Sequence, residues 1–334
     1  MAGNRDHVWV REAPSTVDAE YVQESATVPL RPGQKIAHLF NLNESQEYVL
    51  QRVTERTYWF QRDHYACTFY VGEDGVLLFD PLHERGQYIL EAIKRVTDRP
   101  VKAIVLSHDH YDHIGDADVV LRAMGEIGVH PRLIASEATA RKQLFRGTSQ
   151  PHATEVVAWP HSRFQFEDLH VEFHGFARAA HTDDHSAQLL VEEKVLHAAD
   201  HTNPDEPPFW KFSANENFLY FEPNLRETEE LDWVYENGGH GNVGSHADRD
   251  FYHQYIADMV EAVRRAMDHI GFRDGVKGVE GINSHTAYHT TWTDLVARTA
   301  VDALRPKYGQ YYGFEYGTWS NAEQVVWAQF AYTK

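Results

Sequence analysis

The sequence predicts an α/β protein built as a four-layered αβ/βα sandwich. Runs with strand character alternate with runs of helix character in both halves of the chain, and such a chain buries its apolar surface by placing helices on the outer faces of packed sheets. A dense group of histidines directly follows one apolar run. Open α/β sheets carry their chemistry at this place, beyond the carboxyl ends of the strands.

The first half of the chain is expected to supply one sheet and its helices. Residues 1–55 are polar and interrupted by prolines, and we interpret them as an N-terminal arm. Residues 56–334 then form the main domain, with a C-terminal helical and aromatic extension. Apolar and β-branched patterning predicts strands at residues 57–60, 65–72, 76–80 and 101–106, and helices at 88–96 and 116–125.

The second half shows the same mixture of strands and helices. Strands are expected at residues 132–135, 164–173, 188–192 and 195–199, and helices at 137–145, 231–235, 252–270 and 293–304. The presence of both kinds of element in both halves favours two packed sheets over a single wound sheet.

The composition of the chain indicates which classes of partner and which cellular location to expect. The 334-residue chain has 31 Lys and Arg against 50 Asp and Glu, a formal net charge of −19, so a nucleic-acid backbone or an anionic membrane would repel it. The amino terminus has no apolar stretch like that of a signal peptide, and no segment approaches the about 18 apolar residues of a membrane span. We therefore expect a cytoplasmic protein that acts on a small molecule. A homo-oligomer formed through the N-terminal arm or the C-terminal aromatic segment stays open.

Four candidate metal ligands in the pattern His-x-His-x-Asp-His lie within six residues, in the run Ser107-His-Asp-His-Tyr-Asp-His-Ile-Gly115. Three imidazoles and a carboxylate packed this tightly are difficult to explain except as metal ligands. One ion cannot take all four, because adjacent side chains on a loop diverge. The group therefore favours two metal ions, and its members are His108, His110, Asp112 and His113.

Three later positions are candidates for further ligands of these ions. His181, Asp200 and His240 each follow a strand-like run or lie in a glycine-rich turn. Three other histidines lie within four residues of a proposed ligand, so each could replace that ligand or contact it from outside. They are His185, His197 and His201.

On these residues the chain resembles the metallo-β-lactamase fold superfamily of hydrolases. The resemblance spans roughly residues 57–267 and rests on Asp80 at a strand end, on the His-x-His-x-Asp-His loop, and on the later His, Asp and His in that order. It implies a sandwich of the metallo-β-lactamase type, in which Asp80 orients the ligands from outside. It also implies that His108, His110 and His181 hold one metal ion, that Asp112, His113 and His240 hold the other, and that Asp200 bridges the two.

The ligand types favour zinc and a hydrolytic reaction. Imidazoles and carboxylates without thiolate suit Zn²⁺, with Mn²⁺ and Fe²⁺ as alternatives. Two such ions about 3.5–4 Å apart can share a hydroxide whose pKa falls to near 7 and can polarise the scissile bond. We therefore expect a zinc-dependent hydrolase with two Zn²⁺ per chain and with Asp112 as a catalytic ligand. The zinc-bound hydroxide would attack an ester, lactone or related bond of a small, apolar organic substrate.

Within the resemblance, Asp200 favours the glyoxalase, lactonase and related hydrolase branches over the β-lactamases. Lactonases that open acyl-homoserine lactones commonly carry a tyrosine a few residues after the bridging aspartate, whereas residues 201–204 contain none. A glyoxalase II-like thioesterase is an alternative, although no cluster of basic residues for the carboxylates of its substrate is evident near the carboxyl end. The bond that is broken stays open among ester, lactone, thioester, amide, phosphoester and carbon–halogen bonds.

An aromatic segment shortly after the bridging aspartate is a candidate substrate lid. Phe209, Trp210 and Phe212 could stack on an apolar substrate, or could fill a gap between the halves of the sandwich. Asn203 could donate a hydrogen bond to a developing oxyanion or could start a turn. The aromatic run over residues 308–319 could form a pocket wall or a subunit interface.

Two other functional classes remain as alternatives. A mononuclear iron oxygenase of the same fold would use the same seven residues with one metal ion, so the identity and number of the bound ions separate it from a hydrolase. A non-catalytic metal-binding or scaffold protein would keep every measurable activity unchanged after replacement of Asp112 by Ala. His285 and His289 are spaced to bind a metal on a helix, but they lack a third ligand nearby in the sequence.

Overall fold

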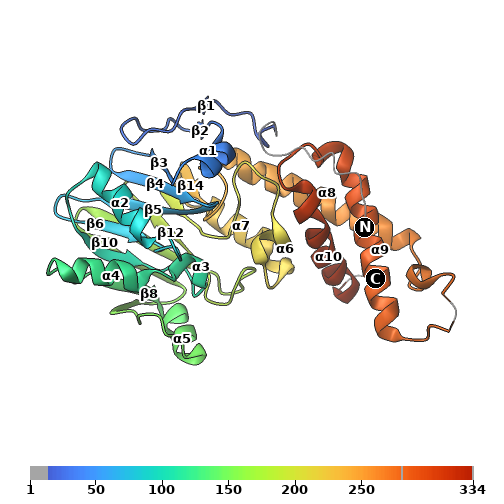
Figure 1. Ribbon diagram of the computed structural model, residues 1–334. Coiled ribbons are helices and arrows are strands. Elements are labelled where there is room, and N and C mark those ends of the chain that lie inside the picture. Colours follow the sequence, from blue (N-terminus) through green and yellow to red (C-terminus); the bar gives the residue numbers. More distant parts are fainter. Residues whose placement is uncertain (1–13, 280, 333–334) are drawn as a thin grey trace.

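The computed structural model describes residues 14–279 and 281–332, and it confirms the four-layered α/β sandwich (Figure 1). The larger sheet has seven strands, each paired with the next in chain order: β3 (Val49–Arg52), β4 (Thr57–Arg62), β5 (Tyr65–Val71), β6 (Val76–Phe79), β7 (Val101–Val105), β8 (Arg132–Ser136) and β9 (Glu155–Val157). The smaller sheet has five: β10 (His161–Phe166), β11 (Leu169–Gly175), β12 (Ser186–Leu190), β13 (Val195–His197) and β14 (Tyr235–Asn237).

The interior between the two sheets is filled by alternate residues of the strands. In β6, Leu77 and Phe79 belong to this core, whereas Leu78 belongs to the core on the other face of the sheet, as the two-residue repeat of a strand requires. Val171 and Phe173 of β11 enter the same interior from the smaller sheet. Because the strands of the larger sheet are buried on both faces, they appear in the sequence as nearly continuous apolar runs.

Helices cover the outer face of the larger sheet and connect its parallel strands. α2 (Gly86–Val96) and α4 (Ala117–Glu126) pack on this face through residues such as Ile89 and Val120. Strands β6, β7 and β8 run parallel, so their carboxyl ends open on one edge of the sandwich. α5 (Glu137–Arg146) follows β8.

The C-terminal part of the chain forms a helical layer with a core of its own. Its helices are α7 (Phe221–Glu229), α8 (His246–His269), α9 (His285–Tyr308) and α10 (Phe314–Tyr332). Met259, Val296 and Val325 from three of these helices pack together. In Figure 1 the helices α9 and α10 extend away from the sheets. Among the described residues, none of the helices combines the length and the apolar character that crossing a membrane requires.

Three elements differ from the sequence-based expectation. The predicted strand at 164–173 is a hairpin, β10 and β11, which turns between Phe166 and Leu169. The predicted helix at 231–235 is a loop that leads into β14, because Trp233 packs with residues of the smaller sheet. β3, within the predicted N-terminal arm, pairs with β4 as an edge strand of the larger sheet.

Candidate metal centre and adjoining cavity

The seven proposed ligands lie at one edge of the sandwich, where strands of both sheets end. The histidine run follows β7, and Asp112 and His113 lie on the single helical turn α3 (Tyr111–Ile114). In the smaller sheet, Asp200 follows β13 and His240 follows β14, and these two strands are parallel. His181 comes from the loop between β11 and β12. Residues far apart in the sequence therefore meet because parallel strands end at the same edge.

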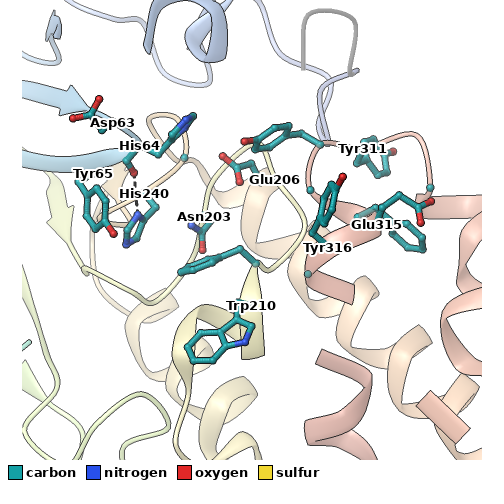
Figure 2. Close-up of a pocket in the computed structure, with 17 residues that line it drawn as sticks. Asp63, His64, Tyr65, Asn203, Glu206, Trp210, His240, Tyr311, Glu315 and Tyr316 are labelled. Atoms are coloured by element: carbon teal, nitrogen blue, oxygen red, sulfur yellow. Dashed lines mark hydrogen bonds between the residues drawn. The ribbon is translucent and has the colours of Figure 1, made fainter. Parts of the chain in front are cut away.

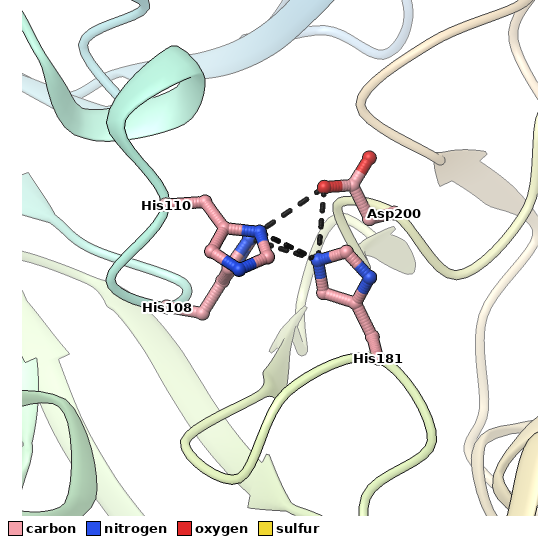
Figure 3. Close-up of side chains that lie close together, drawn as sticks. All are labelled: His108, His110, His181 and Asp200. Carbon is pink, nitrogen blue, oxygen red and sulfur yellow. Dashed lines mark hydrogen bonds and ion pairs between the residues drawn. The ribbon is translucent and has the colours of Figure 1, made fainter. Parts of the chain in front are cut away.

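One compact group contains three imidazoles and one carboxylate (Figure 3). The Nε2 atom of His181 lies 2.9 Å from His110 Nδ1 and 3.2 Å from His108 Nε2. Asp200 Oδ2 lies 3.1 Å from His181 Nε2 and 3.5 Å from His108 Nε2. Ligand atoms around a tetrahedral zinc ion with bonds of about 2.0–2.1 Å are about 3.3 Å apart, so the spacing of this group fits a metal ion.

A second group shares Asp200 with the first. Its members are Asp112, His113, Asp200 and His240. His113 Nε2 lies 3.1 Å from Asp200 Oδ2, and His240 Nε2 lies 2.9 Å from Asp200 Oδ1. The carboxylate of Asp112 is the outermost member, with Oδ2 at 3.7 Å from His113 Nε2 and 43% of the side chain exposed.

Buried polar atoms without hydrogen bonds support the assignment of both groups as metal ligands. Within the described residues, neither the ring nitrogens of His113 nor Oδ1 of Asp200 form a regular hydrogen bond, although His113 Nε2 and Asp200 Oδ1 each lie close to another proposed ligand. Leaving such atoms unpaired costs about 1–3 kcal/mol each. A cation among the converging nitrogen and oxygen atoms would supply the missing partner, so the donor set fits divalent metal ions.

Hydrogen bonds from outside the groups fix the direction of two ligand rings. His181 Nδ1 donates to the carbonyl oxygen of Ser213 at 2.8 Å. His240 Nδ1 donates to the carbonyl oxygen of His64 at 2.9 Å. In each ring the Nε2 atom is thereby left free to face the centre, which is the usual arrangement of histidine metal ligands.

Asp80 lies behind the first group, where it holds the beginning of the ligand loop. Its Oδ1 accepts from the backbone N–H of Ser107 at 2.9 Å, and its Oδ2 accepts from Ser107 Oγ at 2.7 Å. Ser107 Oγ lies 2.9 Å from His108 Nδ1, and His197 Nε2 donates to Asp80 Oδ2 at 2.8 Å. A carboxylate in this place can orient His108 through Ser107.

The backbone is strained at both carboxylates that organise the centre. Asp80 and Asp200 have φ angles of 52° and 62°, in the left-handed region. Non-glycine residues in this region cost of order 1–3 kcal/mol and concentrate at functional sites. Gly239, beside His240, has φ of 79°, and a Cβ there would lie 2.9 Å from His113 Cε1, so only glycine fits next to the second group.

The ionisation of the ligands suits metal binding. Burial, together with His110, lowers the pKa of His108 well below its usual value, and burial with His181 lowers the pKa of His110 to about 4. Burial opposes the ionisation of Asp200, but His113 and His181 hold its pKa well below the usual range. Burial also opposes the charged form of His113, but Asp200 raises the pKa of that ring to about 10. A metal ion at His113 would take the place of that proton.

The three alternative histidines belong to neither group. His185 Nε2 donates to the carbonyl oxygen of Ala199 at 2.7 Å, and His197 contacts Asp80. His201 is buried, with its ring 5.6 Å from that of His185. These rings support the centre from behind.

His285 and His289 lie on α9, with ring centroids 4.5 Å apart. Among the described residues they form no group of three metal-binding side chains. Their contacts with Phe272 instead place them in the aromatic packing of the helical layer.

A cavity of about 620 Å³ adjoins the second group (Figure 2). His240 lines it, as do Asn203, Phe209 and Trp210, three of the four residues proposed to bind substrate. The tyrosine-rich segment at residues 311–317 forms part of the cavity wall. A pocket wall is one of the two roles predicted for the C-terminal aromatic run, the other being a subunit interface.

Phe212, the fourth proposed substrate residue, does not line this cavity. It is 0% exposed and packs against Phe218, Phe221 and Tyr255 in the helical core. Its direction results from the backbone: residues 211–214 of α6 (Trp210–Ala214) have φ angles between 51° and 64°. This left-handed turn brings Trp210 to the cavity and Phe212 to the core.

Helix α10 stabilises this left-handed turn. The N–H of Lys211 donates to Ser320 Oγ at 3.0 Å, and the N–H of Phe212 donates to Asn321 Oδ1 at 2.8 Å. Left-handed geometry costs roughly 1–2 kcal/mol per residue for L-amino acids, so these bonds offset part of the strain. The turn presents the carbonyl of Ser213 to the ligand His181.

Sequence reasoning missed several residues that line the cavity, including Asp63, Tyr65 and Glu206. No local motif marks them. They reach the cavity because the β4–β5 turn and the loop after β13 end at the same edge of the sandwich. The positive φ angles of Asp63 and His64 show how tight that turn is.

Comparison with known proteins gives the same fold. Residues 62–299 match the family model described as the metallo-beta-lactamase superfamily. A probable metallo-hydrolase from Streptococcus pyogenes is 40% identical over 74 residues, which are 22% of this chain and 29% of that protein. The match thus spans less than a third of that relative.

Two solved structures resemble the chain over most of their own length. A metallo-beta-lactamase from Pontibacter korlensis has a TM-score of 0.51 at 18% identity, covering 60% of this chain and 95% of that one. The metallo-beta-lactamase IND-7 has a TM-score of 0.50 at 16% identity, covering 61% and 96%. At such identities the likeness concerns the fold alone.

Proposed function

The chain belongs to the metallo-beta-lactamase superfamily, and we propose that it is a hydrolase that holds two zinc ions with the seven side chains of the metal centre. The observation that carries this proposal is the position of Asp200, whose carboxylate belongs to two separate groups of four ligands. The name of the relative from Streptococcus pyogenes, a probable metallo-hydrolase, agrees with it.

Asp112 is the residue we assign to proton transfer. When bound, two divalent cations supply a hydroxide near neutral pH and polarise the bond that is broken. Asp112 is the most exposed member of the second group, with 43% of its side chain exposed against 11% for His240 and 5% for Asp200. Its Oδ2 therefore lies at the open side of this group. A carboxylate there can orient the attacking water and accept its proton.

Asn203 is placed to contact the substrate. Its Oδ1 accepts a hydrogen bond from Ser213 Oγ at 2.6 Å. The amide nitrogen Nδ2 is therefore the group of this side chain that can donate to a substrate oxygen as negative charge develops on it. Phe209, whose ring lies 5.2 Å from that of His240, would exclude water and hold an apolar part of the substrate next to the centre.

A hydrolase panel tests the proposal. Zinc-loaded protein is assayed with lactones, aryl esters, thioesters and phosphodiesters, and metal-stripped protein is the control. We expect one class to be hydrolysed, to lose hydrolysis on stripping and to regain it with zinc. If thioesters alone respond, the function is that of a thioesterase. Activity that does not depend on metal, or one iron per chain with oxygen consumption, would contradict the proposal.

Replacement of Asp112 separates an enzyme from a protein that only binds metal. Asp112→Ala should abolish hydrolysis while the far-ultraviolet circular dichroism spectrum stays unchanged. Asp118→Ala, which removes an exposed carboxylate from the nearby helix α4, is the matched control and should keep full activity. Retention of full activity in Asp112→Ala would overturn the role assigned to this residue.

A further inference from the structure

The cavity beside His240 has an acidic and aromatic lining that hydrolysis by itself does not require. Three carboxylates line it, from Asp63, Glu206 and Glu315, and the described residues of its wall include neither Lys nor Arg. Aromatic rings supply much of the remaining wall, from Phe209, Trp210, Tyr311, Tyr312, Phe314 and Tyr316. Such a wall repels anions and attracts cations.

Glu206 differs from the other two carboxylates because no cationic side chain among the described residues pairs with it. Asp63 pairs with Arg62 and Arg85, at 3.3 Å and 3.5 Å, and Glu315 pairs with Arg305. Glu206 is only 8% exposed, and in the described part of the chain no side chain forms a hydrogen bond or an ion pair with its carboxyl group. A buried acid without a partner is costly, so its place in the cavity wall calls for a ligand.

The ionisation of Glu206 supports this interpretation. Burial, and then the negative charge of Asp205, raises the pKa of Glu206 to about 8. A positive charge in the cavity would favour the ionised form again. Asp205, in contrast, has its own partners in Ser15 and Tyr21.

We propose that the cavity binds a substrate that carries an alkylammonium group, held by the carboxylate of Glu206 and by the surrounding aromatic rings. An ammonium group gains both from a buried carboxylate and from the faces of Trp and Tyr rings, and each cation–π contact contributes about 0.5–2 kcal/mol. Neither a neutral nor an anionic group of the same size gains both.

The shape of the cavity orients such a substrate. Figure 2 shows His240 and Tyr65 on one side and Tyr311 and Tyr316 on the other, with Glu206 between them. The bond to be broken would lie at the His240 end, and the ammonium group would lie on the side of Glu206 and the tyrosines. This orientation rests on the proposed function, whereas binding of the cation does not.

Two small probes of equal shape test the inference. Choline carries a trimethylammonium group, and 3,3-dimethylbutan-1-ol carries a tert-butyl group in its place without charge. Their dissociation constants for zinc-loaded protein are measured by isothermal titration calorimetry. We expect choline to bind at least about 10-fold more tightly than the alcohol.

Two variants test whether the preference for choline over the alcohol depends on residues of the cavity wall. Glu206→Gln keeps the size of the side chain and should remove most of the preference for choline, with little change for the alcohol. Trp210→Leu replaces a ring that is 53% exposed and should weaken choline binding a few-fold more than alcohol binding. Glu126→Gln, which makes the same change at an exposed position of α4, is the matched control and should retain the full preference.

Equal affinity for the two probes, or an undiminished preference in Glu206→Gln, would overturn the inference. If Glu206→Gln does not fold, Trp210→Leu decides, and an unchanged ratio of the two affinities contradicts the proposal. The two proposals can fail separately. A preference for choline without metal-dependent hydrolysis would refute only the proposed function, and hydrolysis without the preference would refute only this inference.

Discussion

The edge of the sandwich and the C-terminal helices contribute different parts of the same site. All seven proposed ligands lie in residues 62–299, the region that matches the family model. The tyrosine-rich wall of the cavity at residues 311–317 lies beyond that region, at the junction of α9 and α10. The two solved structures of the same fold cover 60% and 61% of this chain.

The two regions thus contribute different properties to the site. Strand ends set the metal ligands, because the positions of parallel strands in a sheet are fixed by their hydrogen bonds. The C-terminal helices and the segment between them add the tyrosine-rich part of the cavity wall and Glu315, whereas Asp63 and Glu206 come from loops at the edge of the sandwich. Specificity depends on such a pocket rather than on the fold. The two regions meet at the left-handed turn of α6, where α10 contacts the segment that orients His181.

The largest effect on metal binding and hydrolysis is expected from Asp200→Ala, at the edge of the sandwich where the strands end. Removal of the shared carboxylate takes a ligand from both groups, so metal affinity and the rate of hydrolysis should each fall by more than about 100-fold. This loss is larger than the loss of about 10–100-fold that is usual when a residue that hydrogen-bonds a ligand is replaced. Metal analysis and initial rates check this. Two firmly held ions in Asp200→Ala would contradict the role assigned to the shared carboxylate.

A smaller loss is expected from Asp80→Asn, which keeps the volume but weakens the hold on Ser107 and His197. Metal affinity should fall by about 10–100-fold, the usual range for residues behind the ligands. Competition with a chromophoric chelator measures it. Asp74→Asn, in the exposed turn before β6, is the matched control, and equal affinities in the two variants would show that Asp80 does not orient the loop.

Asn321→Ala tests whether the two regions are independent. Loss of its bonds to Phe212 N and to the carbonyl of Pro208 leaves buried groups unpaired, so the free energy of unfolding should fall by about 1–3 kcal/mol. Because the turn also orients His181, zinc affinity should fall as well, by less than about 10-fold. Denaturant unfolding and chelator competition measure the two effects. If the variant is destabilised but its zinc affinity is unchanged, the metal centre does not depend on the contacts of α10.

The smallest effect on the metal centre is expected from Tyr316→Ala. This ring lines the cavity and is 64% exposed, so its loss should change the free energy of unfolding by no more than about 0.5 kcal/mol. Zinc content should stay at the wild-type value, while the KM of the substrate found in the panel rises several-fold. Loss of zinc from this variant would contradict the division between the two regions.

The sequence predicts the strand-end region well because its signals are local. An apolar β-branched run, a ligand-rich loop and a helix are adjacent in the chain around β7, and each can be recognised without knowledge of distant contacts. The sequence predicts one strand where β10 and β11 form a hairpin, because the alternation of apolar and polar residues resumes directly after the two-residue turn at Glu167 and Asp168.

The cavity could be predicted only in part, because its residues come together through long-range packing. The aromatic residues at 209 and 210 were recognisable, but Phe212 points into the core because of a left-handed turn that helix α10, over 100 residues later in the sequence, helps to stabilise. No sequence motif marks Glu206, and its role as a candidate binding residue follows only from its burial without a partner among the described residues. The helix predicted at 231–235 failed for a similar reason, since contact of Trp233 with the smaller sheet prevails over local helix preference.

The central claim is that two groups of ligands share Asp200, and counting zinc ions tests it most directly. Zinc per chain is measured by inductively coupled plasma mass spectrometry, after dialysis, for the wild-type chain and for His240→Ala, which leaves the group of His108, His110, His181 and Asp200 complete. We predict two ions for the wild-type chain and one for the variant. One ion in both proteins would contradict the claim.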